Sequence, residues 1–235
     1  MSRHNRFKGK PCAYCGVERV DMTADHVFAK SLFATRKRGG LPIVAACEAC
    51  NNAKSKLEHY AATVLPMGSG DPAALEVWDE RGIERVKKNR IVRDHLKNAS
   101  TVWVTHSKVL MPRMGIPFEP DQITGLFEFI AKGLVNHHWN AVVPADYFVG
   151  AKFAKAGDER PFMDRLVGHA ADEVRGVAGD DAVLYQGWRF LDDPWSSFWR
   201  ARIYGGLTLG QGGRSGDSAP FDINMLVMPR SVDET

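Results

Sequence analysis

Four cysteines, all within the first 50 residues, constrain this 235-residue chain more than any other feature. They form two matched pairs, Cys12-x2-Cys15 and Cys47-x2-Cys50, with 31 residues between the pairs. In a reducing compartment, two such pairs are the arrangement by which four thiolates close a tetrahedral zinc site. The spacing therefore predicts one structural zinc ion, Zn2+, with no open position for chemistry. Four free thiols and a thiol-based redox pair are the alternative interpretations.

The composition is that of an ordinary water-soluble domain. Hydrophobic residues make up 44% of the chain and charged residues 25%, as is typical of globular proteins. No stretch approaches the ~18 apolar residues of a membrane span, and the first residues lack the apolar segment of a secretory signal. We therefore expect a cytoplasmic protein with no membrane partner, in which thiols stay reduced.

Positive charge is concentrated at the beginning of the chain. Residues 1–60 carry 11 Lys or Arg against 5 Asp or Glu, whereas the remainder carries 20 against 23. This asymmetry indicates that the first quarter meets a polyanion such as nucleic acid, although many basic faces are merely solvated. The residues expected to grip the backbone are Arg36, Lys37 and Arg38, on the predicted loop between two strands, and Lys56.

The sequence predicts an α+β fold with two domains. A cysteine-bearing domain covers residues 1–64, and the Gly- and Pro-rich stretch 65–72 begins a second domain over residues 65–235. The second domain is predicted to mix helices with antiparallel strands; its role is target recognition or assembly, including a protein partner or a homodimer. The expected elements are a helix from 120 with apolar residues at helical spacing, and strands at 101–106, 183–191, 198–208 and 221–229.

Residues 10–60 resemble the HNH (ββα-metal) endonuclease family. The resemblance rests on CxxC, then "DHVFAK" from Asp25 to Lys30, then the apolar run "LPIVAAC", then "CNNAKSK" from Cys50 to Lys56. It implies two strands and a helix folded around the zinc frame. The remaining residues match nothing that informs function.

The resemblance also implies a set of catalytic roles. His26 would act as the general base that activates water, because an imidazole titrates near neutrality. Asp25 and Asn51 would hold a divalent ion, and their oxygen donors suit Mg2+ or Mn2+. Lys54 shares a helix face with Asn51 and would meet a phosphate oxygen or the charge of the transition state. Adjacent strand residues point to opposite faces, so Asp25 and His26 need a twist or bulge to converge on one phosphate.

One departure from the family pattern affects the second strand. Many members carry an Asn there that orients the general base, whereas this chain has Pro42 or Ile43 at the corresponding position. Either a backbone carbonyl holds the imidazole or its orientation is looser. Relatives with a zinc frame often lack this Asn as well.

The sequence therefore predicts a metal-dependent endonuclease that hydrolyses phosphodiester bonds. DNA is the expected substrate, RNA is left open, and small nucleases of this kind often belong to phage, mobile-element or defence systems. The rival interpretation is a non-catalytic zinc module that docks on nucleic acid or protein. The intact Asp25–His26 pair together with Asn51 favours the enzyme, since a pure binder has no use for a base beside a metal site.

Overall fold

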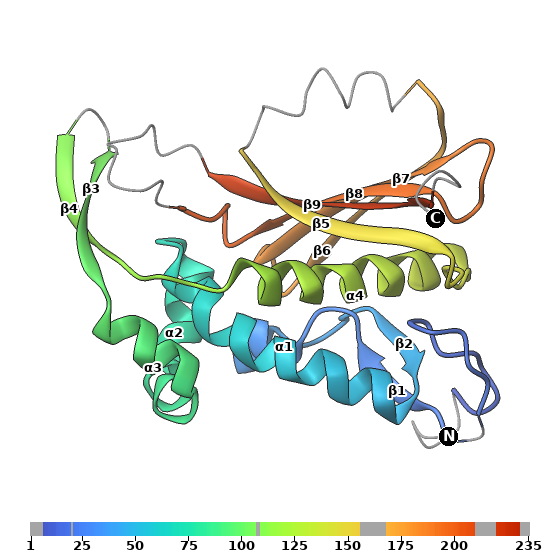
Figure 1. The fold of residues 1–235 in the computed structure, drawn as a ribbon, viewed down its shortest axis with the longest axis horizontal. Coiled ribbons are helices and arrows are strands. Elements are labelled where there is room, and N and C mark those ends of the chain that lie inside the picture. Colours follow the sequence, from blue (N-terminus) through green and yellow to red (C-terminus); the bar gives the residue numbers. More distant parts are fainter. Residues whose placement is uncertain (1–6, 20, 107–108, 156–167, 210–219, 231–235) are drawn as a thin grey trace.

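The fold of this chain is known from a computed structural model that describes residues 7–19, 21–106, 109–155, 168–209 and 220–230. Figure 1 shows a five-stranded sheet, a long helix (α4) across one face of it, and a smaller unit of helix α1 with strands β1 and β2 beyond α4. Helices α2 and α3 and a separate hairpin extend from one end. The predicted α+β class is confirmed by this mixture of helices and antiparallel sheets.

The first part of the chain contains two short strands and one long helix. The elements in order are β1 (Thr23–His26), η2 (Lys30–Leu32), η3 (Thr35–Lys37), β2 (Ile43–Ala46) and α1 (Glu48–Met67). β1 and β2 pair antiparallel, with Thr23 opposite Ala46 and His26 opposite Ile43. A two-stranded pair of this length is marginal by itself, so its stability depends on what packs against it.

The elements that follow are α2 (Pro72–Lys88), α3 (Arg90–Lys97), β3 (Ser100–His106), β4 (Val109–Gly115), α4 (Pro120–Trp139), β5 (Tyr147–Lys155), β6 (Ala170–Ala178), β7 (Val183–Phe190), β8 (Ser197–Ile203) and β9 (Phe221–Pro229). β3 and β4 form a separate antiparallel hairpin, and the large sheet has the antiparallel order β5-β9-β8-β7-β6. The predicted strands at 101–106, 183–191, 198–208 and 221–229 all correspond to observed strands.

Helix α4 joins the two halves of the molecule. It contacts β5 and β9 of the sheet on one side and α1 and β2 on the other. The apolar residues predicted to define this helix are all buried: Ile123, Leu126, Phe127, Ile130 and Leu134. Gly133 allows close approach, because a Cβ there would lie 3.0 Å from a Val27 methyl group. Among the described residues, no helix is long and apolar enough to cross a membrane.

The predicted division at residue 64 falls inside α1, which continues to Met67. Asp71 then caps α2: its Oδ1 accepts the Ala73 amide at 2.8 Å, and Pro72 occupies the first helical turn. A single cluster of buried apolar residues includes side chains from both predicted domains. The two parts therefore share one interior through α4.

Candidate metal centre and adjoining polar network

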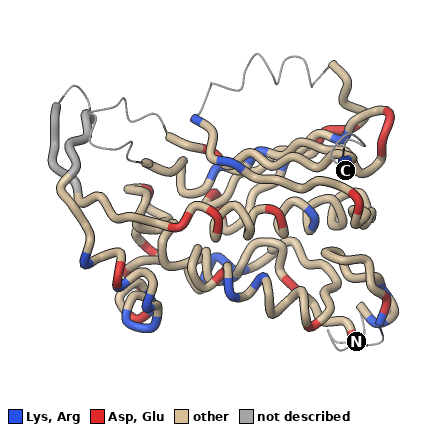
Figure 2. The backbone as a smooth tube through the Cα atoms, in the orientation of Figure 1, with Lys and Arg blue, Asp and Glu red and all other residues tan. Residues whose placement is uncertain are grey.

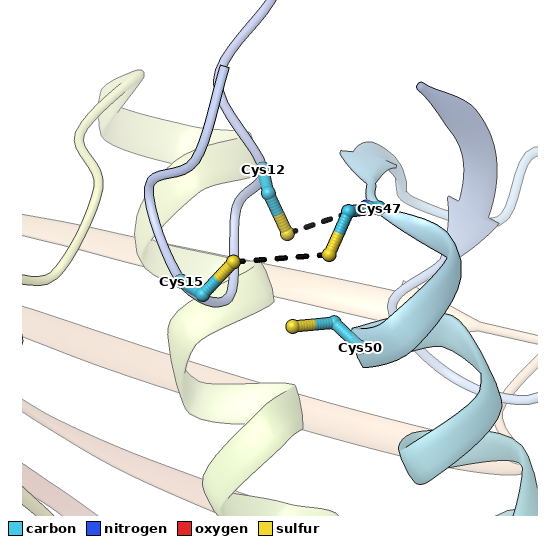
Figure 3. Close-up of side chains that lie close together, drawn as sticks. All are labelled: Cys12, Cys15, Cys47 and Cys50. Atoms are coloured by element: carbon cyan, nitrogen blue, oxygen red, sulfur yellow. Dashed lines mark hydrogen bonds between the residues drawn. The ribbon is translucent and has the colours of Figure 1, made fainter. Parts of the chain in front are cut away.

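The four cysteines lie together at one end of α1 (Figure 3). Cys12 and Cys15 lie on a tight turn that closes with Gly16 at φ 75°, a left-handed conformation that favours glycine. Cys47 is the residue that precedes α1, and Cys50 lies in its first turn. The turn and the helix start therefore bring both CxxC pairs to one point.

The geometry of the four thiols fits one tetrahedral metal ion. Their sulfur atoms all lie within 4.8 Å of one another, and Cys15 Sγ is 3.8 Å from Cys47 Sγ. Zinc–sulfur bonds of about 2.3 Å in a tetrahedron require sulfur separations of about 3.8 Å. The Cys47 amide also donates to Cys12 Sγ at 3.4 Å. Within the described residues, this is the sole group of three or more His, Cys, Asp or Glu side chains positioned to hold a metal.

The donor set indicates which ion would be bound. Burial and the neighbouring thiols raise the pKa of Cys50 well above its ordinary value, so the four groups would not all ionise without a cation. A bound soft divalent ion removes these protons, because a coordinating thiol is held as thiolate. Four sulfur ligands suit zinc, whereas magnesium and manganese prefer oxygen.

Strand β1 carries Asp25 and His26 past the start of α1. Pairing with β2 is regular from Thr23 to His26, without a bulge, and it continues beyond because the Val27 amide donates to the Pro42 carbonyl at 2.9 Å. Of the twist or bulge expected from the sequence, the regular register excludes a bulge over these four residues. The side chains of Asp25 and His26 therefore leave opposite faces of the strand, and one phosphate can meet both only at the strand end.

Asp25 faces α1 and belongs to a buried polar network. Its Oδ2 accepts a hydrogen bond from the Tyr14 hydroxyl and lies 3.0 Å from Lys54 Nζ. The same ammonium group donates to Glu58 and, at 2.7 Å, to the His26 carbonyl. Burial raises the pKa of Tyr14, and the Asp25 charge raises it further. Tyr14 therefore stays protonated and donates its hydroxyl hydrogen.

Lys54 has a different environment from the one expected. Its side chain has no exposed surface, and its three donor positions are directed to Asp25, Glu58 and the His26 carbonyl. In this arrangement it neutralises carboxylates within the protein and does not point to solvent, where a phosphate would bind. Burial is the main cause that raises the pKa of Glu58, and the Lys54 charge opposes that rise.

Asn51 lies on the first turns of α1, on the side that faces β1. Its Nδ2 donates to Thr23 Oγ1 at 3.4 Å, and Thr23 shares a strand face with Asp25 because the two are two residues apart. Asn51 and Asp25 therefore lie on the same side of β1. His26 is brought to the same strand but to its other face.

The four residues expected to grip nucleic acid fall into two groups. Arg36 forms a two-point ion pair with Glu76 of α2, with Nε 2.6 Å from Oε1, and Lys37 also contacts Glu76 at 3.5 Å. Their positive charge is thus partly cancelled. Arg38 and Lys56 have no carboxylate partner among the described residues, and each lines a surface hollow.

Two members of the network, Tyr14 and Glu58, were not predicted from the sequence. Glu58 had a visible signal, because it lies four residues after Lys54, the spacing at which opposite charges pair on a helix. Tyr14 had none beyond its position between the first two cysteines, since its contact with Asp25 depends on the folding of the turn against β1.

Comparisons with protein-family models, with curated proteins and with solved structures found no match to this chain.

Proposed function

We propose that this protein is a zinc-stabilised, metal-dependent endonuclease that hydrolyses phosphodiester bonds of nucleic acid, with DNA as the first substrate to test. The observation that carries the proposal is the order of strand, strand and helix around the four thiols, with Asp25 and His26 on β1 and Asn51 on α1. Zinc would supply the frame. Mg2+ or Mn2+ would supply the positive charge that phosphodiester hydrolysis needs.

The Asp25 carboxylate has one oxygen available for a divalent ion. Its hydrogen bond from Tyr14 and its ion pair with Lys54 both go to Oδ2, which leaves Oδ1 for the metal together with the Asn51 side-chain oxygen. Tyr14 and Lys54 would then hold the carboxylate in place. We assign Lys54 this positioning role in place of direct contact with phosphate.

His26 would act from the strand end. It leaves the opposite face of β1 from Asp25, so a phosphate that meets both side chains would lie at the end of the strand, where His26 would take a proton from the attacking water. An attacking water opposite the leaving oxygen is the in-line geometry of such reactions. The Lys54 bond to the His26 carbonyl fixes the backbone from which the imidazole projects.

A non-catalytic zinc module that docks on nucleic acid or protein is the second candidate. It is favoured by one observation, which is that Lys54 already supplies a cation to Asp25 in a site where Asp25 is only 8% exposed. In this case the polar network would only link β1 to α1.

Cleavage assays on the full chain separate the two candidates. Supercoiled plasmid and single-stranded DNA and RNA are incubated with Mg2+ or Mn2+, beside His26→Ala and the control His169→Ala, which changes an exposed histidine in the sheet region. His26→Ala should lose about 10²–10⁴-fold in rate while keeping its metal content and fold. The control should cut as the wild type does.

Two further arms make the assay decisive. After EDTA treatment, zinc alone should restore the fold but not cleavage, and zinc with Mg2+ should restore both. Asn51→Ala should shift the Mg2+ dependence to higher concentration. If His26→Ala cuts as fast as the wild type, the general base is misassigned. If the wild type cuts no substrate in either ion, the docking module becomes the better account.

A further inference from the structure

A strongly basic cavity lies between α1, α2 and the segment that follows β1. It has a volume of about 310 Å³. The cations that line it are Lys30, Arg38, Arg81, Arg85 and Lys88, and its one carboxylate is Glu84. Three of the cations come from α2, which lies outside the predicted nuclease domain. The cavity therefore combines charges from both parts of the chain.

Arg85 is built into the wall of this cavity. Its Nη1 donates to the Ala62 carbonyl and its Nη2 to the Ser31 carbonyl, both at 2.8 Å. These carbonyls satisfy the donors but do not cancel the charge. Burial lowers the pKa of Arg85, and the positive charges of Arg38 and Arg81 lower it further. The positive charges of Arg38 and Arg81 thus lie near the Arg85 guanidinium, which its two hydrogen bonds hold in place.

The cations of the cavity outnumber the carboxylates near them, which are Glu84 in its wall and Glu80 close to Arg38 and Arg85. None of its five cations takes part in the ion pairs found among the described residues, whereas the adjacent Arg36 and Lys37 both pair with Glu76. Converging cations in a hollow create a positive potential that attracts anions. Guanidinium groups are also well suited to bind phosphate through two parallel hydrogen bonds.

A second hollow continues the first along the outer face of α1. It has a volume of about 650 Å³ and is lined by Asn52, Ser55, Lys56 and His59. His59 lines both hollows, so they lie side by side, and we call the surface that they make together the α1–α2 groove. Two adjacent hollows with polar donors in both fit an extended chain of phosphates better than a single small anion.

We propose that the α1–α2 groove holds the phosphate backbone of a nucleic-acid strand. The inference rests on the proposed function in one respect, since it takes the polyanion to be nucleic acid; it does not require cleavage. Lys30 follows His26 by four residues, so the groove begins close in the chain to the candidate base. Figure 2 also shows Lys and Arg gathered at the turn between α2 and α3; of the residues at that turn, Lys88 lines the groove, whereas Lys87 and Arg90 do not.

A pair of matched double variants tests the groove. Arg81→Gln with Lys88→Gln removes two groove charges, and both side chains are exposed on α2. Lys87→Gln with Arg90→Gln is the control, because it removes the same residue types from the same region but outside the groove. Arg85 is left unchanged because its bonds support the fold.

Binding is measured on the full chain by fluorescence anisotropy, without added Mg2+ or Mn2+, from 50 to 300 mM salt. The probes are a labelled 24-base-pair DNA duplex and single strands of DNA and RNA of the same sequence. The groove variant should bind about tenfold or more weakly at 0.1 M salt, and the slope of log K against log salt should fall by about 2. The control variant should lose much less on both measures.

The outcomes separate this inference from the proposed function. Loss of binding in the groove variant alone supports the groove, even if the wild type never cleaves. Equal binding by the two variants overturns it, even if cleavage is found. The inference also fails if the wild type binds none of the three probes at 50 mM salt. A last outcome would indicate a small-anion site and overturn the inference. In that outcome, inorganic phosphate raises the Tm of the wild type but not of the Arg81 and Lys88 double variant, and the two proteins bind the oligonucleotides equally.

Discussion

The two sides of α4 are stabilised in different ways. The large sheet has strands of seven to nine residues and an apolar interior in which Trp199, Ile223 and Met225 are fully buried. The unit on the other side has two four-residue strands, and the contact between β1 and α1 is made by a buried lysine between two carboxylates. The sheet combines long strands and a large apolar interior with ion pairs from the buried Asp222 to Arg200 and Arg202. The smaller unit has short strands, a cysteine cluster that can hold a metal ion, and a buried lysine paired with two carboxylates.

Breaking the metal frame should have the largest effect. Cys47→Ser removes one of four thiolates from a closed shell, and structural zinc in small domains contributes roughly 10–16 kcal/mol of apparent binding free energy at pH 7. We expect residues 7–60 to lose protection from hydrogen exchange. All six tryptophans lie after residue 77, so tryptophan fluorescence reports on the other part of the chain and should change little.

Zinc content by elemental analysis completes this test. The wild type, purified without chelator, should contain one zinc per chain, and Cys47→Ser should contain much less. Wild-type protein without zinc would contradict the metal assignment. Full loss of the tryptophan signal in Cys47→Ser would show that the sheet also depends on the frame, and the contrast between the two sides of α4 would then be wrong.

Features that depend on residues close together in the chain were predicted from the sequence, whereas features that depend on distant contacts were not. The cysteine pairs and the apolar period of α4 are local patterns, and each is found where expected. β4, β5 and β6 were not predicted. The alternation of β5 is interrupted by Gly150, and that of β6 by Gly and Ala residues. Those strands are defined mainly by their partners in the sheet.

Within the site, burial was the property that could not be predicted. Lys54 reads as an exposed residue on a polar helix face, and its burial depends on Asp25 arriving from a strand 29 residues earlier in the chain. The α1–α2 groove was hidden for the same reason. Arg81 and Lys88 lie more than 40 residues after Arg38 in the chain, and only the packing of α2 beside the segment that carries Lys30 and Arg38 brings these charges together.

The buried network should give the next largest effect. Lys54→Met removes the cation that lies between Asp25 and Glu58, which leaves buried carboxylate charge without compensation. Breaking a buried pair in this way costs about 3–5 kcal/mol. Lys56→Met is the matched control, since Lys56 is an exposed lysine on the same helix, and its effect should stay within about 0.5 kcal/mol.

Urea unfolding with zinc in excess measures both variants. The loss in Lys54→Met should appear first in probes of residues 7–60, such as hydrogen exchange, and later in tryptophan fluorescence. Equal stability of Lys54→Met and Lys56→Met would mean that water reaches the carboxylates, and Asp25 would then be open to a divalent ion without help from Lys54.

The smallest expected effect is a pH dependence on the sheet side of α4. His138 packs against Trp199, and its Nε2 lies 3.1 Å from the Tyr185 hydroxyl. Burial, with the neighbouring His137 charge, lowers the pKa of His138 to about 4, and Asp172 partly opposes this. The unfolded chain takes up a proton near pH 6.5, but the folded chain does not until about pH 4. Stability contributed by neutral His138 is therefore present above about pH 6.5 and is lost as the pH falls toward 4.

His138→Gln should flatten this part of the stability profile, because glutamine stays neutral and can still bond to the Tyr185 hydroxyl. One histidine can contribute at most about 1.4 kcal/mol per pH unit, and partial exposure of the ring to solvent reduces this. Urea midpoints from tryptophan fluorescence between pH 4.5 and 7.5 provide the measurement, with His169→Gln as the exposed control. The same acid loss in both variants would place the titrating group elsewhere, and protonation of the zinc thiolates would be the first candidate. In that case the sheet side would depend on the metal frame after all, because α4 packs on both.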